Sequence, residues 1–167
     1  LSVETMKKTN AARILDRLKV DYELVEYEVD EEDLSAEHLA QTAGLDIGKV
    51  FKTLVLQGDR TGIFVCVIPG GMAIDLKMAA SVSGNKKVAM IKMKELEPLT
   101  GYIRGGCSPV GMKKEFPTFI DETAFEQPFI YISAGVRGLQ MKVHPTMLTK
   151  VCKAKPAAIA TEKPEED

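Results

Sequence analysis

One lysine interrupts an apolar run and is the first candidate for chemistry. Lys52 stands within the segment Val50–Leu56, and strand geometry places it on the same face as Val50, Leu54 and Leu56. An ammonium group on a buried face is costly unless it meets an anion or hydrogen-bond acceptors. Such a lysine can shift its pKa for catalysis, or hold a carbonyl or phosphate group. It can equally be an edge-strand lysine that prevents aggregation, or one whose ammonium reaches water, and the spacing alone slightly favours this simpler interpretation.

A glycine-rich segment is the second candidate. Residues 105–111 have the sequence Gly-Gly-Cys-Ser-Pro-Val-Gly. Glycines let backbone N–H groups approach a ligand closely, and consecutive N–H groups can form an anion-binding nest. Such a nest could stabilise the oxyanion of an acyl transfer, although a tight surface loop is the commoner explanation of consecutive glycines. Residues 133–138, Ser-Ala-Gly-Val-Arg-Gly, end a strand in similar fashion and are expected to face the same cavity.

Thiol, metal and nucleotide chemistry find less support. Cys107 could be a nucleophile, but a reactive cysteine needs a base or a cationic setting. The sequence places neither of the two histidines, His38 and His144, near it. Two isolated histidines also give no metal cluster, so no metal is expected. No glycine-rich phosphate loop precedes a helix, and a nucleotide cofactor is therefore not expected either.

The elements that must position these residues follow from periodicity and capping. The expected helices are residues 10–18, 35–43, 75–83 and 145–152, with Thr9, Ser35 and Asp75 as N-caps, Pro145 at a helix start, and Gly44 and Gly84 at helix ends. The expected strands are residues 22–29, 50–56, 63–68 and 129–132, and the turn at 58–62 joins the middle two into a hairpin. Tyr27 shares the inward face of the first strand with Val25 and Val29, where a core aromatic is more common than a ligand.

The pattern of elements predicts an α+β fold. Short strands outnumber helices, hairpins imply antiparallel pairing, and no regular alternation of strand and helix appears. A mixed, mostly antiparallel β-barrel surrounded by helices is therefore expected, as a single domain over residues 6–160. We interpret residues 1–5 as a foreign extension before a native start at Met6, and residues 161–167 as an acidic, frayed tail.

Composition and charge limit the class of protein. The chain has 167 residues, of which 45% are hydrophobic and 28% charged, as is ordinary for one soluble domain. The three cysteines lie far apart, which suits a reducing, cytoplasmic setting, and no apolar run is long enough to cross a membrane. Residues 21–46 contain ten acidic side chains and no lysine or arginine, whereas residues 77–114 carry a net charge of +6. The basic segment could contact phosphates, or the two segments could simply be solvated faces.

Four segments carry a family resemblance: Phe51–Leu54, Gly101–Gly111, Ile130–Ser133 and Arg137–Leu139. The sequence closely resembles the YbaK/EbsC family, bacterial deacylases of misacylated Cys-tRNA(Pro), which are related to the editing domain of bacterial prolyl-tRNA synthetases. Similarity runs from about Thr9 to Ala160, and the glycine-rich signature is long and specific. The resemblance implies the barrel with surrounding helices that the strand count also suggests.

The resemblance also implies roles for individual residues. Lys52 matches the lysine that is essential to the family, and residues 105–109 match its Gly-x-x-x-Pro motif. Cys107 stands where relatives carry an aliphatic residue, which demotes it as a nucleophile. The implied catalytic residues are Lys52, Gly105 and Gly106, and the implied substrate-binding residues are Tyr27, Thr53, Cys107, Ser108, Pro109 and Ser133.

The resemblance implies an enzyme that removes cysteine from Cys-tRNA(Pro), with Cys-tRNA(Cys) as a further candidate substrate. It implies action in trans, prolyl-tRNA synthetase as a partner, and no cofactor. The family mechanism that the resemblance implies lets the substrate thiol attack its own carbonyl, so that the cysteine leaves as a cyclic thiolactone. No Ser-His, Cys-His or metal site is visible in the sequence, and the protein is therefore expected to contribute position and electrostatics. Two alternatives remain: a water-dependent deacylase of another small residue such as alanine, and a catalytically silent module that binds tRNA or a synthetase. The retention of Lys52 in an apolar strand argues against the silent module.

Overall fold

The structure, a computed structural model, describes residues 8–164, so the expectations for residues 1–5, Met6 and 165–167 lie outside the described range. The helices are α1 (Asn10–Arg17), α2 (Ala36–Ala43), α3 (Leu76–Ser83), α4 (Met93–Thr100) and α5 (Thr146–Val151), with short 3-10 segments η2 (Ile47–Lys49) and η3 (Glu122–Glu126). The strands are β1 (Glu23–Glu26), β2 (Phe51–Gly58), β3 (Gly62–Pro69), β4 (Ala73–Ile74), β5 (Val88–Met90), β6 (Thr118–Asp121), β7 (Ile130–Ser133), β8 (Leu139–Val143), β9 (Lys155–Ala157) and β10 (Ala160–Thr161).

Three helices begin at the predicted caps. The side chains of Thr9, Ser35 and Asp75 each accept a hydrogen bond from a backbone N–H in the first turn of α1, α2 and α3, which satisfies a donor that the helix itself leaves free. Gly44 and Gly84 end α2 and α3 in the left-handed conformation, as predicted. None of the described helices is long and apolar enough to cross a membrane.

The strands form a mixed set of sheets. A five-stranded sheet has the order β5-β2-β3-β6-β9, a three-stranded sheet has the order β1-β8-β7, and β4 pairs with β10. The predicted hairpin is present, with β2 and β3 antiparallel and Gly58 opposite Gly62. The pairings of β3 with β6 and of β6 with β9 are parallel, and the other pairings between described strands are antiparallel.

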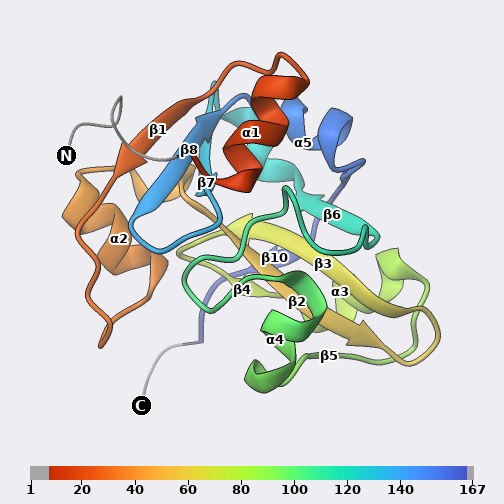
Figure 1. Cartoon of the computed structure of the whole chain (residues 1–167). Helices are drawn as coiled ribbons and strands as arrows, with labels where there is room; N and C mark the ends of the chain where they lie inside the picture. The colour runs from red at the N-terminus through yellow and green to blue at the C-terminus, as the bar shows by residue number, and fades with distance from the viewer. Residues whose placement is uncertain (1–7, 165–167) are drawn as a thin grey trace.

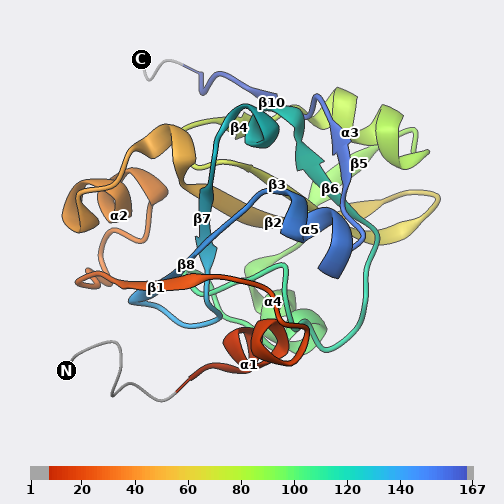
Figure 2. The same ribbon diagram turned by 90° about the horizontal axis from the view of Figure 1, so that it is seen from above.

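The expected closed barrel is not formed by these pairings. In the described chain the sheets remain separate, and only an isolated parallel bridge between Val50 and Tyr131 joins the start of β2 to β7. Figures 1 and 2 show the three-stranded sheet crossing over one face of the five-stranded sheet, with α2 and α3 at opposite ends. The fold is therefore a mixed α+β arrangement of packed sheets with helices outside.

The central hairpin is buried on both faces. On one face, Val55 and Val65 join a cluster that includes Leu15 of α1 and Leu148 of α5. On the other face, Leu56, Phe64 and Ile68 pack with Ala79 of α3 and Ile159 near the chain end. Two-sided burial explains why β2 and β3 are near-continuous apolar runs, and it makes the polar interruption at the start of β2 informative.

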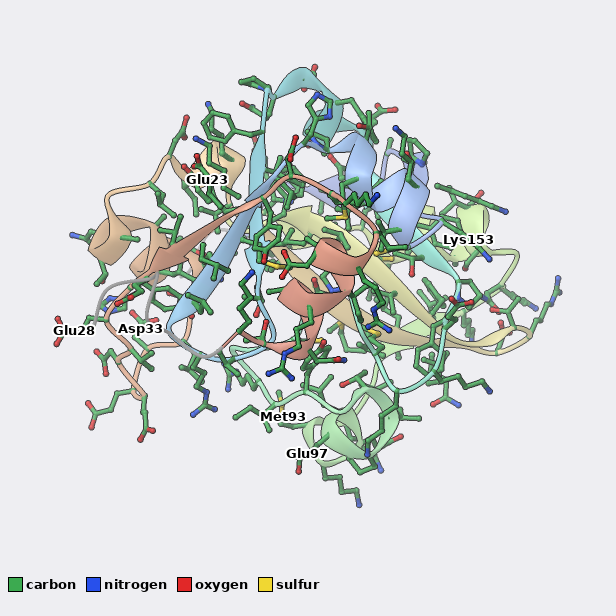
Figure 3. The ribbon with its side chains drawn as sticks, turned by 45° about the horizontal axis from the view of Figure 1, so that its top comes forward. Glu23, Glu28, Asp33, Met93, Glu97 and Lys153 are labelled. Carbon is green, nitrogen blue, oxygen red and sulfur yellow. The ribbon has the colours of Figure 1, made fainter. Side chains whose placement is uncertain are left out.

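The acidic segment that follows β1 lies at one side of the molecule. Glu28 and Asp33 lie beside α2, and Lys153 lies on the opposite side (Figure 3). Beyond β1, the backbone N–H of Tyr27 donates to the carbonyl of Gly138 at 3.0 Å. The strand predicted over residues 22–29 is therefore shorter in the structure, where β1 covers Glu23–Glu26. The chain then continues into the acidic segment.

Candidate active site

Lys52 lies in a cavity of about 380 Å³ between α2, the start of β2 and the glycine-rich segment. The lining includes residues 34–37 and Leu39, residues 50–55, Met90, Ile91, Met93, Leu96, Arg104, Gly105, Cys107, Ser133, Gln140 and Lys163. We call this cavity the Lys52 pocket. Its walls are mainly apolar with a few polar groups, which is the usual composition of a small-molecule site.

The surroundings of Lys52 disfavour the charged form of its side chain. Burial lowers the pKa of Lys52 below its ordinary value, the nearby charge of Lys163 lowers it further, and the carboxylate of Glu37 opposes both effects. Within the described residues, no carboxylate lies within 4.0 Å of the Lys52 ammonium as an ion-pair partner. A partly buried cation without a bound anion is poised to stabilise negative charge on a ligand.

Two buried polar atoms of the pocket lining have no hydrogen-bond partner within residues 8–164. They are Oγ1 of Thr53, next to the lysine, and Oε1 of Gln140 on β8. Gln140 is 3% exposed, so its carboxamide is a polar group held inside the fold. Leaving such groups unpaired costs free energy, and a polar ligand in the pocket would recover it.

The glycine-rich segment is fixed to the neighbouring loop by backbone contacts. Gly105 lines the pocket in the left-handed conformation, with φ of +85°. A Cβ atom on Gly106 would meet backbone atoms of Val136 and Arg137 at 3.2 Å. The Nε of Arg137 donates to the carbonyl of Arg104 at 2.8 Å. Glycine at position 106 therefore allows the two loops to approach each other at the pocket wall.

The other residues of the motif have different surroundings. Cys107 lines the pocket, but burial raises the pKa of its thiol to about 12, which keeps it protonated. Ser108 is fully buried, and its Oγ accepts a hydrogen bond from the N–H of Val110 at 3.2 Å. Pro109 faces a different cavity. Of the motif, only Gly105 and Cys107 line the Lys52 pocket.

Ser133 and Tyr27 take separate positions around the same wall. Ser133 lines the Lys52 pocket, and its Oγ accepts a hydrogen bond from the N–H of Gly135 at 3.1 Å. Tyr27 does not line it. It borders a much smaller adjoining hollow, which shares Gly105 and Leu39 with the pocket.

Besides Ser35, which was predicted only as a helix cap, four polar lining residues were not predicted from the sequence: Glu37, Arg104, Gln140 and Lys163. They come from α2, the approach to the glycine-rich segment, β8 and the chain after β10. Gln140 offered a local signal, as a polar residue among apolar neighbours at Leu139 and Met141. Arg104 directly precedes the glycine-rich motif and belongs to the basic segment 77–114, whereas Glu37 and Lys163 have sequence surroundings typical of a solvated surface.

The histidines lie elsewhere. His38 borders the hollow beside Tyr27, and the ring of His144 interacts with Thr146 near α5. Neither of them lines the Lys52 pocket. Across residues 8–164 no three His, Cys, Asp or Glu side chains gather in a way that could hold a metal ion.

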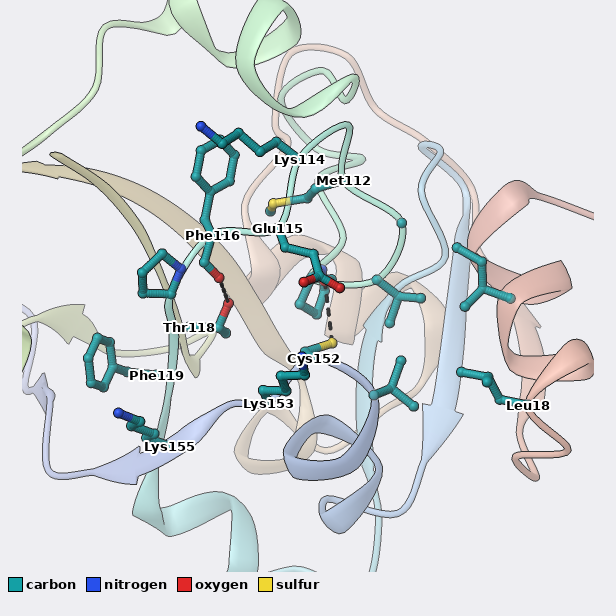
Figure 4. Close-up of a pocket in the computed structure, with 16 residues that line it drawn as sticks. Leu18, Met112, Lys114, Glu115, Phe116, Thr118, Phe119, Cys152, Lys153 and Lys155 are labelled. Atoms are coloured by element: carbon teal, nitrogen blue, oxygen red, sulfur yellow. Dashed lines mark hydrogen bonds between the residues drawn. The ribbon is translucent and has the colours of Figure 1, made fainter. Parts of the chain in front are cut away.

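A second cavity lies behind the glycine-rich segment, and we call it the rear groove (Figure 4). It measures about 610 Å³ and is lined by Ile14 of α1, by Leu18 at the end of that helix, and by residues 109–112, 114–119, 151–153 and Lys155. The thiol of Cys152 donates to the carbonyl of Pro109 at 3.3 Å, and Thr118 donates to the carbonyl of Phe116 at 2.9 Å. The rear groove is larger than the Lys52 pocket, but these polar side chains are already satisfied.

Comparison with known proteins defines the class. Residues 30–151 match the family model of the aminoacyl-tRNA editing domain. The chain is 47% identical to EbsC of Enterococcus faecalis, named as a Cys-tRNA(Pro)/Cys-tRNA(Cys) deacylase. The alignment spans 159 residues, which are 95% of this chain and 97% of that protein. It is also 23% identical to YwhH of Bacillus subtilis over 70% of this chain and 73% of that one.

Solved structures show the same fold. A crystal structure of the protein APE2540 superposes with a TM-score of 0.83 at 19% identity, covering 92% of this chain and all of that one. A structure described as a trans-editing enzyme for prolyl-tRNA synthetase superposes with a TM-score of 0.78 at 24% identity, covering 93% and 99%. The chain belongs to the aminoacyl-tRNA editing domain family, and the family resemblance inferred from its sequence is confirmed.

Proposed function

We propose that this protein is a trans-editing deacylase that removes cysteine from Cys-tRNA(Pro), and from Cys-tRNA(Cys) as a second substrate. Membership of the editing family and the 47% identity to EbsC support the substrate class. The observation that carries the proposal is the Lys52 pocket itself. A partly buried ammonium, which ion-pairs with no carboxylate of the described chain, faces the same cavity as two unpartnered polar atoms. Such a site suits a polar acyl ester entering an apolar pocket.

Among the described residues that line it, the Lys52 pocket offers no effective general base. The Cys107 thiol stays protonated because burial raises its pKa to about 12. The hydrogen bond from Lys163 lowers the pKa of Glu37, with burial opposing it, so that carboxylate is a weak base at neutral pH. Neither histidine lines the cavity. These features favour chemistry in which the substrate supplies its own nucleophile.

The mechanism we propose therefore uses the thiol of the bound cysteine. Its sulfur attacks the ester carbonyl, a carbon–sulfur bond forms, the ester carbon–oxygen bond breaks, and the proton passes to the released ribose hydroxyl. The product is a cyclic thiolactone. Lys52 stabilises the negative charge that develops on the carbonyl oxygen, and the backbone around Gly105 and the polar atoms of Thr53 and Gln140 orient the acyl end.

Prolyl-tRNA synthetase is the partner we propose, within the cytoplasm. Cysteine and proline are similar in size, and the amino-acid pocket of a synthetase discriminates poorly between near-isosteres by binding alone. A second protein that removes the wrong product corrects this error. The overall charge of −2 is unfavourable for strong tRNA binding by the deacylase alone, so association with a tRNA-bound synthetase would supply effective concentration.

The decisive experiment compares matched tRNA(Pro) charged with cysteine, S-methylcysteine, serine or alanine. Rapid release of cysteine is expected, with very slow release of serine and of the methylated residue, because a hydroxyl without a base is a weak nucleophile. Release of S-methylcysteine or alanine as fast as cysteine would show that water attacks. A wild-type protein inactive on every charged tRNA would leave only a binding role.

A further inference from the structure

The chain after β10 brings a second cation to the Lys52 pocket. Lys163 follows β10 by two residues, and its Nζ lies 2.7 Å from Oε2 of Glu37 in the first turn of α2. Both side chains line the Lys52 pocket. A contact between residues 126 positions apart thus forms part of the lining of the cavity.

A buried carboxylate fixes this part of the chain. Oδ1 of Asp121 accepts hydrogen bonds from the N–H groups of Ile159 and Ala160 at 3.0 and 2.9 Å, and Asp121 is 3% exposed. Hydrogen bonds to a buried charged group are among the stronger ones in proteins. The backbone three residues before Lys163 is therefore held firmly, and the reach of Lys163 to the pocket is set by the fold.

Stability does not explain the ion pair. The side chains of Lys163 and Glu37 are 41% and 49% exposed, and pairs this exposed contribute little, about 0–1 kcal/mol. Placing a second ammonium at the pocket is instead unfavourable for Lys52, whose charged form it opposes. Two cations at one cavity, one partly buried and one at the rim, would be stabilised by a ligand with two negatively polarised groups at different depths.

An aminoacylated tRNA end has two such groups. The ester carbonyl is neutral until the reaction begins, whereas the phosphodiester of the terminal nucleotide carries a full, hydrated charge. A rim lysine suits the phosphate because its ammonium is a flexible, strongly hydrated point charge. We propose that Lys163 binds the phosphate of the 3′-terminal nucleotide, exchanging the carboxylate of Glu37 for a phosphate oxygen, and leaves Lys52 to the acyl group. This assignment rests on the proposed function.

The division of roles predicts a separation of kinetic constants. In Lys163→Met the KM for Cys-tRNA should rise about tenfold with kcat within about twofold, since the phosphate contact is the same in ground and transition states. The dependence of log KM on log salt concentration should weaken by about 0.7, the value for one phosphate of a single strand. Lys155→Met, in the rear groove, is the matched control and should change neither quantity.

Direct competition tests the same contact without a charged tRNA. Adenosine 5′-monophosphate should inhibit the wild-type protein more strongly than adenosine, and Lys163→Met should abolish that difference. The affinities for adenosine 5′-monophosphate and adenosine can also be measured by calorimetric titration. This comparison does not need deacylation, so it tests the phosphate contact even if the proposed function fails. If the wild-type protein is active and Lys163→Met keeps its KM, salt dependence and nucleotide preference, the role assigned to Lys163 is wrong while the proposed function stands. A loss of kcat with KM unchanged would overturn it as well, because it would place Lys163 at the reacting atoms.

Discussion

The Lys52 pocket and the rear groove are separated by one segment of chain, residues 105–111. Gly105 and Cys107 face the Lys52 pocket, whereas Pro109, Val110 and Gly111 face the rear groove. Each cavity contains lysine and a partly buried cysteine. In the rear groove, however, the three lysines Lys114, Lys153 and Lys155 are exposed, as befits solvated cations.

The difference lies in polar groups that the protein leaves unsatisfied. The rear groove is larger, at about 610 Å³ against about 380 Å³, yet the polar atoms described there bond to the backbone. The Lys52 pocket holds a partly buried ammonium and two oxygens that have no hydrogen-bond partner among residues 8–164. Cavity size alone therefore does not identify the site. The cost of burying polar groups without partners does, because folding retains such groups only where something offsets the cost.

The largest effect should come from the lysine. Lys52→Ala should fold normally, since it removes a partly buried charge, and should lose about 10²–10³-fold in kcat, as when an oxyanion donor is removed. Single-turnover deacylation of Cys-tRNA(Pro) measures it. Lys155→Ala is the rear-groove counterpart and should keep the wild-type rate. A normal rate in Lys52→Ala would remove the chemical distinction between the two cavities.

The next effect should come from the shared segment. Gly106→Val would push its side chain against the backbone of Val136 and Arg137, where even a Cβ comes to 3.2 Å. The resulting displacement of the pocket wall should cost about 10–10²-fold in kcat. Gly106→Ala, with a smaller intrusion, should lose less. The unfolding midpoint of each variant shows whether the loss is local, and undiminished activity in Gly106→Val would mean that this wall does not orient the substrate.

A smaller effect is expected in the pH profile. Lys52 acts as a cation, so activity should be present at lower pH and decline as pH rises through its lowered pKa. Lys163 contributes to that lowering, and Glu37 opposes it. The declining limb of kcat/KM, corrected for spontaneous hydrolysis, should therefore move to higher pH in Lys163→Met and to lower pH in Glu37→Gln. Shifts in the same direction for both variants would contradict the electrostatic coupling.

The smallest effect is expected for the two cysteines that face the cavities. Burial raises the pKa of both Cys107 and Cys152 to about 12, so neither thiol is a ready nucleophile. Cys107→Ala and Cys152→Ala should each retain activity within about twofold. Intact-protein mass spectrometry during turnover provides the check. A covalent adduct at Cys107, together with an inactive Cys107→Ala protein, would show that Cys107 is the nucleophile.

Structural features that depend on a single residue could be predicted from the sequence. Thr9, Ser35 and Asp75 begin helices because each side chain caps its own first turn. Helix α4 was missed because Lys92 provides no side-chain cap and Pro98 lies inside the helix. Strands β6 and β9 pair in parallel with partners far away in sequence, and no local pattern specifies such neighbours.

The same distinction applies to the site. Lys52 could be singled out because its own strand makes it costly, and Gly105 because its motif is dense in glycine. Glu37 and Lys163 meet at the pocket although 126 positions separate them in the sequence. The closed barrel was expected from the strand pattern and from the resemblance, but the edges of the sheets are not joined by continuous pairing. Registers between distant strands depend on the whole packing arrangement rather than on residue type.

The anchoring of the last strands by Asp121 has a consequence for synthesis on the ribosome. Chains emerge from their N-terminal end, so residues 155–163 are made after every other described helix and strand. Until they arrive, β6 presents an unpaired edge where β9 will bind, and the oxygen of Asp121 that will bind Ile159 and Ala160 lacks those partners. Open strand edges favour aggregation. A nascent chain stalled before Lys155 would thus carry Lys52 in an incomplete pocket, and would be a substrate for chaperones and proteases before it could be an editing enzyme.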